Sequence, residues 1–131
     1  MKLKYSIGFL IASVVQAAII MLTETFGISS LGANFTATQL IIHILAGQIA
    51  GYILLYIVNK LKIINKINIG VIGAIWGIVV WTIILSINSI QGTVNAPWVQ
   101  GISTVLSSII AFVLYGIISS STIKRYSYSK H

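Results

Sequence analysis

Four stretches of about twenty residues without a charged side chain constrain this chain most, at residues 5–23, 38–58, 68–88 and 98–122. A helix needs about 20 apolar residues to cross a hydrocarbon layer of ~30 Å. The stretches lack the alternating pattern of barrel strands, and backbone groups in lipid must pair within their own segment. We therefore predict an all-α integral membrane four-helix bundle, formed by a single four-span domain over residues 1–131.

The composition excludes the main soluble classes. Charged residues make up 7% of the chain and hydrophobic residues 57%, whereas a soluble domain carries about 25% charged residues. This balance excludes a water-soluble monomer, a disordered chain and a nucleic-acid-binding module. Without cysteine, and with Glu24 as the single acidic residue, disulfides and most metal-ligand sets are also excluded. We expect no metal, no cofactor and no enzyme activity.

The basic residues predict the orientation of the spans. They precede the first stretch, separate the second from the third, or follow the fourth, and they are Lys2, Lys4, Lys60, Lys62, Lys66, Lys124, Arg125 and Lys130. Positive charges stay on the cytoplasmic side of a membrane. We therefore expect a cell-membrane protein with both termini cytoplasmic, whose cations face lipid headgroups and not nucleic acid. We also expect residues 5–23 to remain as a span and not to be cleaved as a signal peptide.

Aromatic residues near the predicted span ends are expected to lie at the membrane interface, where their amphipathic rings are common. These residues are Tyr5, Tyr56, Trp98, Tyr115, Tyr126 and Tyr128.

Two G-x-x-x-G motifs mark places of close helix approach. Gly47 and Gly51 form one motif, and Gly73 and Gly77 form the other. Two glycines four residues apart leave one face of a helix open to a neighbouring backbone. We expect these faces to pack within the chain, with a homodimer face as the alternative. Trp81, four residues after Gly77, is expected to fill space against the next helix.

Polar side chains inside the spans are the candidates for function, because they are costly in lipid and usually face the protein interior. The predicted topology gathers most of them in the outer half of the bundle and leaves Gln16 in the inner half. The candidate polar cluster consists of Glu24, His43, Gln48, Asn88, Ser103 and Ser107. His43 and Glu24 could relay protons or bind a cation, but a helix-end carboxylate and a structural histidine are the favoured interpretation.

Small polar residues on the fourth stretch form a narrow stripe, through the pairs Ser103/Ser107 and Thr104/Ser108 at i, i+4 spacing. Such a stripe could line a water-filled path. We favour a tight helix contact, because serines in membrane helices commonly bond to their own backbone or to a neighbour.

The run IGAIWGIVVW at 72–81, followed by Asn88, resembles the third span of the YqhR-type conserved membrane proteins of Gram-positive bacteria. Residues 104–116 are similar to the last span of that family. The resemblance covers about half of the chain. It implies four spans and carries no activity, cofactor or site residue.

These features favour a small non-enzymatic membrane protein, either an accessory subunit of another membrane protein or a homo-oligomer. A transporter or channel for an ion, a proton or an apolar solute is the first alternative and would use the polar cluster. A holin-like pore-former is the second alternative. The transporter requires His43 and Glu24 to line a shared cavity, whereas the accessory protein requires them to be apart.

Overall fold

The computed structural model describes residues 2–28, 37–61, 68–92 and 97–128. Four long helices account for most of this part: α1 (Lys2–Thr25), α2 (Ala37–Leu61), α3 (Ile69–Gln91) and α5 (Ile102–Tyr128). A short helix, α4 (Pro97–Gln100), precedes α5, and these ranges contain no strand. The prediction of an all-helical chain is confirmed.

Each long helix is long and apolar enough to cross a membrane. The shortest, α3, has 23 residues, which at 1.5 Å per residue extend over about 35 Å. The candidate spans are Leu3–Thr25, Leu40–Lys60, Ile69–Gln91 and Ile102–Tyr126. These apolar helices indicate a multi-pass membrane protein.

The fourth span begins later than the sequence predicts. The helix expected over residues 98–122 is interrupted at Gly101, which adopts a φ of 120°. Side chains rarely tolerate this backbone conformation, so glycine lets the chain turn between α4 and α5. The middle of the span therefore shifts towards the C-terminus, which changes the depth assigned to every residue on α5.

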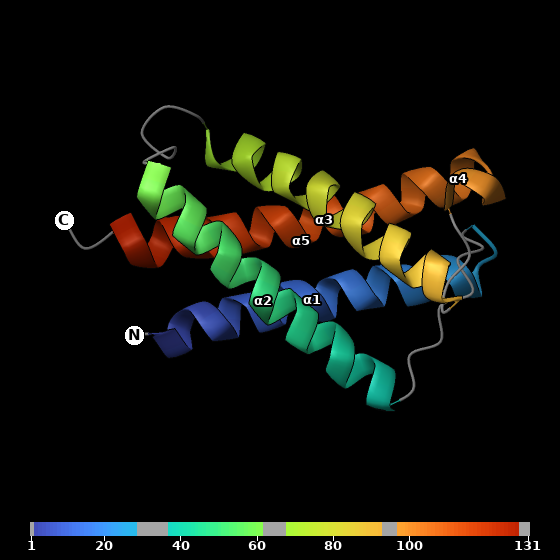
Figure 1. Ribbon diagram of the computed structural model, residues 1–131, viewed down its shortest axis with the longest axis horizontal. Helices are drawn as coiled ribbons and strands as arrows, with labels where there is room; N and C mark the ends of the chain where they lie inside the picture. The colour runs from blue at the N-terminus through green and yellow to red at the C-terminus, as the bar shows by residue number, and fades with distance from the viewer. Residues whose placement is uncertain (1, 29–36, 62–67, 93–96, 129–131) are drawn as a thin grey trace.

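Helix α5 is the centre of the arrangement. It packs along α3 and α1, and it also touches α2, whose main contact is with α1 (Figure 1). Helix α2 crosses the front of α1 and diverges from α3 towards the end at which α3 finishes (Figure 1). Helices α1, α3 and α5 thus form a closely packed group, and α2 is the least enclosed long helix.

Glycines allow the closest of these contacts. A Cβ atom on Gly77 would lie 2.7 Å from Val113 Cα, and one on Gly116 would lie 2.8 Å from the Gly77 nitrogen. Gly73 also faces α5, at Ile117. Small residues of this kind let helix backbones approach in lipid, where no hydrophobic effect drives helices together. The Gly73/Gly77 face thus packs within the chain, and its partner is α5.

The other glycine motif also packs within the chain, but against a different helix. Gly51 lies beneath the Phe9 ring, and Gly47 lies against the Ser13 side chain, so both face α1. The two motifs do not face one another across α2 and α3. Each meets a neighbour that carries no G-x-x-x-G motif of its own at the contact, and these neighbours are α1 for α2 and α5 for α3.

The two ends of the helices differ in charge. Helix α1 begins, and α2 and α5 finish, at the same end of the molecule (Figure 1). Lys4 Nζ lies 5.4 Å and Arg125 Cζ lies 5.6 Å from the centre of the Tyr126 ring, while Lys60 Nζ donates a 3.1 Å hydrogen bond to the Tyr56 hydroxyl. Cationic and tyrosine side chains therefore share this end. Lys62, Lys66 and Lys130 lie outside the described residues.

Candidate functional site

Two separate apolar clusters form the core, and a polar layer lies between them. One cluster contains Phe9, Leu54, Val58, Ile72 and Ile123, and the other contains Ile20, Val80, Leu85, Ala111 and Phe112. Along α1, the residues between Phe9 and Ile20 include Ser13 and Gln16, which are buried. Along α5, the residues between Phe112 and Ile123 include Tyr115 and Ser119, which are also buried.

The buried polar residues of α1 follow from helical spacing. Phe9, Ser13, Gln16 and Ile20 are separated by four, three and four residues, so they occupy one face of the helix. That face is directed at the protein interior, since the four side chains are at most 5% exposed. Ser13 and Gln16 therefore replace apolar residues in the middle of an otherwise apolar stripe.

Tyr115 of α5 reaches across to α2. Its side chain is 1% exposed, and its hydroxyl donates a hydrogen bond to the Gly47 carbonyl. We predicted Tyr115 at the membrane interface, and this prediction is wrong. It lies in the middle of its span because that span begins at Ile102 and not at residue 98.

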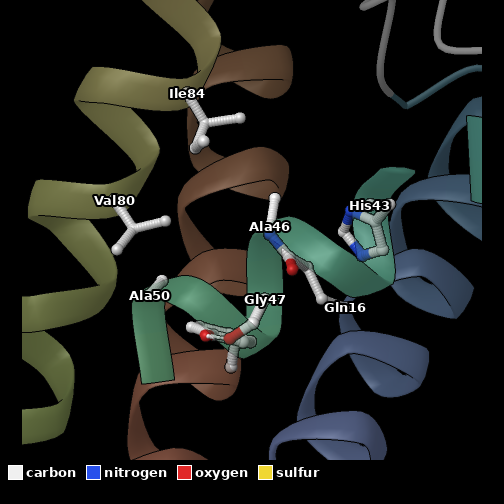
Figure 2. Close-up of a pocket in the computed structure, with 8 residues that line it drawn as sticks. Gln16, His43, Ala46, Gly47, Ala50, Val80 and Ile84 are labelled. Carbon is white, nitrogen blue, oxygen red and sulfur yellow. Dashed lines mark hydrogen bonds between the residues drawn. The ribbon is translucent and has the colours of Figure 1, made fainter. Parts of the chain in front are cut away.

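A small cavity lies beside these side chains, with a volume of about 30 Å³. All four long helices contribute to its lining, and Figure 2 shows the Gln16 amide pointing into the space between α2, α3 and α5. The lining residues are Gln16, His43, Ala46, Gly47, Ala50, Val80, Ile84 and Tyr115. Gln16 and Tyr115 thus meet near the middle of their spans, and His43 reaches the same cavity from the first part of the α2 span.

His43 is held against α1. Its Nε2 atom lies 3.0 Å from the Ser13 carbonyl oxygen. A carbonyl oxygen can only accept, so Nε2 carries the hydrogen in this arrangement. Glu24 is eleven residues further along α1 than Ser13, or about 16 Å of helix, and it does not line the cavity. The structure therefore does not bring His43 and Glu24 together at a shared site.

The other members of the predicted polar cluster are dispersed as well. Gln48 donates a 2.8 Å hydrogen bond to the Ser6 carbonyl, near the beginning of α1 and not in the outer half. Asn88 donates to the Ile84 carbonyl of its own helix at 2.9 Å. Ser103 is exposed, whereas Ser107 is buried. Glu24, Asn88, Ser103 and Ser107 do lie towards one end of the molecule, where α1 and α3 finish and α5 begins (Figure 1). The six residues do not form a single site, because local hydrogen bonds and helix rotation direct them to different neighbours.

The small polar residues of α5 form a helix contact. Ser108 accepts a 2.8 Å hydrogen bond from the Trp81 indole and donates to the Thr104 carbonyl at 2.7 Å. The Trp81 ring also packs against Trp98, with the ring centres 5.9 Å apart. Ser108 therefore takes part in a contact between α5 and α3, and Trp81 packs between α3, α4 and α5.

Sequence reasoning underestimated the middle of the protein. It included Gln16 among the polar residues but did not single out Ser13 or Tyr115 as members of a site. The spacing of Phe9, Ser13, Gln16 and Ile20 on one face was the available signal, because it places two polar groups on a face that is otherwise apolar. No comparable signal linked Tyr115 to Gly47, which is 68 residues away.

The side chains around the cavity support hydrogen bonding and little other chemistry. Gln16, His43 and Tyr115 offer hydrogen-bond donors and acceptors, and the lining of the cavity contains no carboxylate. The described residues contain no group of three histidine, cysteine or acidic side chains that could hold a metal ion. Comparison with family models, with curated proteins and with solved structures gives no match to this chain, so these contacts carry the functional argument.

Proposed function

We propose that this chain forms a four-helix bundle in the cell membrane with both termini in the cytoplasm. The support is the shared position of Lys4, Lys60, Lys124 and Arg125 at one end of the helices, where tyrosines suited to a headgroup layer accompany them. Glu24 is at the other end, where α1 finishes.

Reporter fusions test this topology. A cytoplasm-active reporter fused after His131, and the same reporter fused before Met1, are expected to be active. A reporter active outside the cytoplasm, inserted between Gly27 and Ile28, is expected to be active in its own compartment. Reporter activities that place the two termini on opposite sides would refute the proposed orientation.

The function that the geometry supports best is that of a non-enzymatic membrane subunit, which acts by associating with another membrane protein or with a second copy. The observation that carries this proposal is the use of the polar side chains. Gln48, Trp81, Tyr115 and Ser120 hydrogen-bond to neighbouring helices of the same chain. These groups hold the helices together. The central cavity beside Tyr115, at about 30 Å³, is far smaller than the 300 Å³ or more that an organic substrate typically needs. Gln48 also borders a wide, open and almost wholly apolar groove of about 460 Å³ on the surface of α2, which is not an enclosed substrate pocket. Membership of the YqhR-type family stays a prediction.

A path for protons or small ions is the second candidate, favoured by the position of the cavity. Transporter sites commonly lie near the middle of the membrane, and Gln16 and Tyr115 are near the middle of their spans. We expected a transporter to have both His43 and Glu24 in a shared cavity, whereas His43 lines this cavity and Glu24 does not. The holin-like alternative stays a prediction.

One reconstitution experiment separates the two candidates. The purified full chain, labelled with one fluorophore, is placed in vesicles at decreasing protein-to-lipid ratios, and photobleaching steps and proton flux are recorded. The subunit proposal expects a fixed oligomer, or a partner retained at constant stoichiometry after gentle extraction, together with flux equal to that of protein-free vesicles. A monomer at every ratio with no stoichiometric partner would contradict it. Flux that is lost in His43→Ala would support the second candidate instead.

A further inference from the structure

The side chain of Gln16 has an unusual environment. It is 3% exposed, it lines the central cavity, and its amide points into that cavity (Figure 2). No hydrogen bond joins this amide to another residue in the described ranges. The neighbouring Ser13 hydroxyl is fully buried and likewise has no hydrogen-bond partner within the part of the chain that the structure describes.

These groups lie between apolar clusters in the middle of the spans. The two apolar clusters flank the polar layer on both sides along α1, α3 and α5. A buried polar group without a partner costs about 1–3 kcal/mol, and more in hydrocarbon. A primary amide has two donors and one acceptor to satisfy. The site therefore favours an occupant that can both donate and accept hydrogen bonds.

The volume and the lining restrict that occupant. A cavity of about 30 Å³ exceeds the ~10–15 Å³ that one water molecule requires. It is far below the size of a site for an organic ligand. A cation is disfavoured because neither Asp nor Glu lines the cavity. The lining is polar at Gln16, His43 and Tyr115, and the remaining lining is aliphatic or glycine.

We propose that this cavity is a binding site for one or two water molecules, which hydrogen-bond to the Gln16 amide in the middle of the membrane-embedded part of the protein. The water is a ligand of the interface between α1 and α2, since Gly47 lies against Ser13 and His43 bonds to the Ser13 carbonyl beside it. The proposal rests on the cavity and the buried amide, so it holds whether the protein acts as a subunit or as an ion path.

Solid-state NMR of the full chain in lipid bilayers tests this site. Magnetisation is transferred from water to side-chain nitrogens in a sample labelled on Gln and Trp, and the Gln16 signal is identified by its loss in Gln16→Met. We expect transfer to the Gln16 amide. The matched control is the Trp76 indole nitrogen, which is also buried without a partner but does not line the cavity, and which should receive none.

A second NMR measurement, on alanine methyl groups, makes the test independent of the Gln16 signal. In a sample labelled on alanine methyl groups, water should transfer to Ala46, which lines the cavity, and not to Ala111, which is fully buried elsewhere. The Ala46 transfer should fall in Gln16→Met, because methionine has a similar length but no amide. Absence of transfer to Gln16 and Ala46 in the wild type would overturn the proposal. Transfer that depends on sodium, and is lost when a large organic cation replaces it, would also overturn it, since the occupant would then be an ion.

Discussion

Replacement of Gly77 with alanine is expected to destabilise the protein by about 1–3 kcal/mol, the usual range for an overpacked interior. The new methyl group would lie 2.7 Å from Val113 Cα and 2.8 Å from the Phe112 carbonyl carbon. These are backbone atoms of α5 and cannot rotate away as a flexible side chain can. Helices α3 and α5 would have to separate along their length, and steric trapping in bicelles would measure the loss of stability.

The matched control is Gly70→Ala on the same helix. The added Cβ of this variant would meet a single side-chain atom, Asn68 Oδ1, at 3.2 Å. Alanine favours a helix over glycine by up to about 1 kcal/mol, so Gly70→Ala should be neutral or slightly stabilising. If Gly77→Ala were as stable as Gly70→Ala, the close contact between α3 and α5 would be wrong.

Truncation of Tyr115 to alanine is expected to cost about 3–5 kcal/mol, as for other large buried aromatic side chains. The ring is 1% exposed, lies at the centre of the polar layer, and carries the hydroxyl that bonds to the Gly47 carbonyl. Its removal would enlarge the central cavity and release α2 from α5. Tyr115→Phe retains the ring and should cost about 0.6–2 kcal/mol, the range measured for hydrogen bonds between membrane helices.

The measurement is again the free energy of unfolding in bicelles, with Tyr56→Ala as the control. Tyr56 is 62% exposed on the same chain, and its hydroxyl is paired with Lys60 and not with another helix. We expect Tyr56→Ala to change the stability little. Equal effects of Tyr115→Ala and Tyr56→Ala would contradict the buried position of Tyr115 and the link that it forms to α2.

The helices themselves could be predicted from the sequence because the requirement is local. Any uncharged stretch of about twenty apolar residues satisfies its backbone hydrogen bonds as a helix, whatever surrounds it. The predicted ranges agree with α1, α2 and α3 within a few residues. The fourth range differs at its beginning, because a positive φ at Gly101 divides residues 97–128 into two helices, and a Gly in an apolar run does not reveal this conformation.

The candidate site could be predicted less well, because depth along a span does not determine which neighbour a side chain meets. His43, Gln48 and Asn88 were grouped by depth, yet His43 bonds to Ser13, Gln48 bonds to Ser6, and Asn88 bonds within its own helix. Helix rotation and crossing angle decide these partners. They depend on the packing of all the helices at once.

The amino-acid sequence by itself determined the four apolar helices, the concentration of basic residues beside three helix ends, and the glycine faces that permit close approach. These properties arise within single segments. The tertiary structure alone decided that α5 would be the central helix, that the two glycine motifs would face α1 and α5, and that Gln16, His43 and Tyr115 would meet around one cavity. Those outcomes depend on contacts between residues that are distant in the sequence, and side-chain shape and hydrogen bonding between helices determine which of these contacts form.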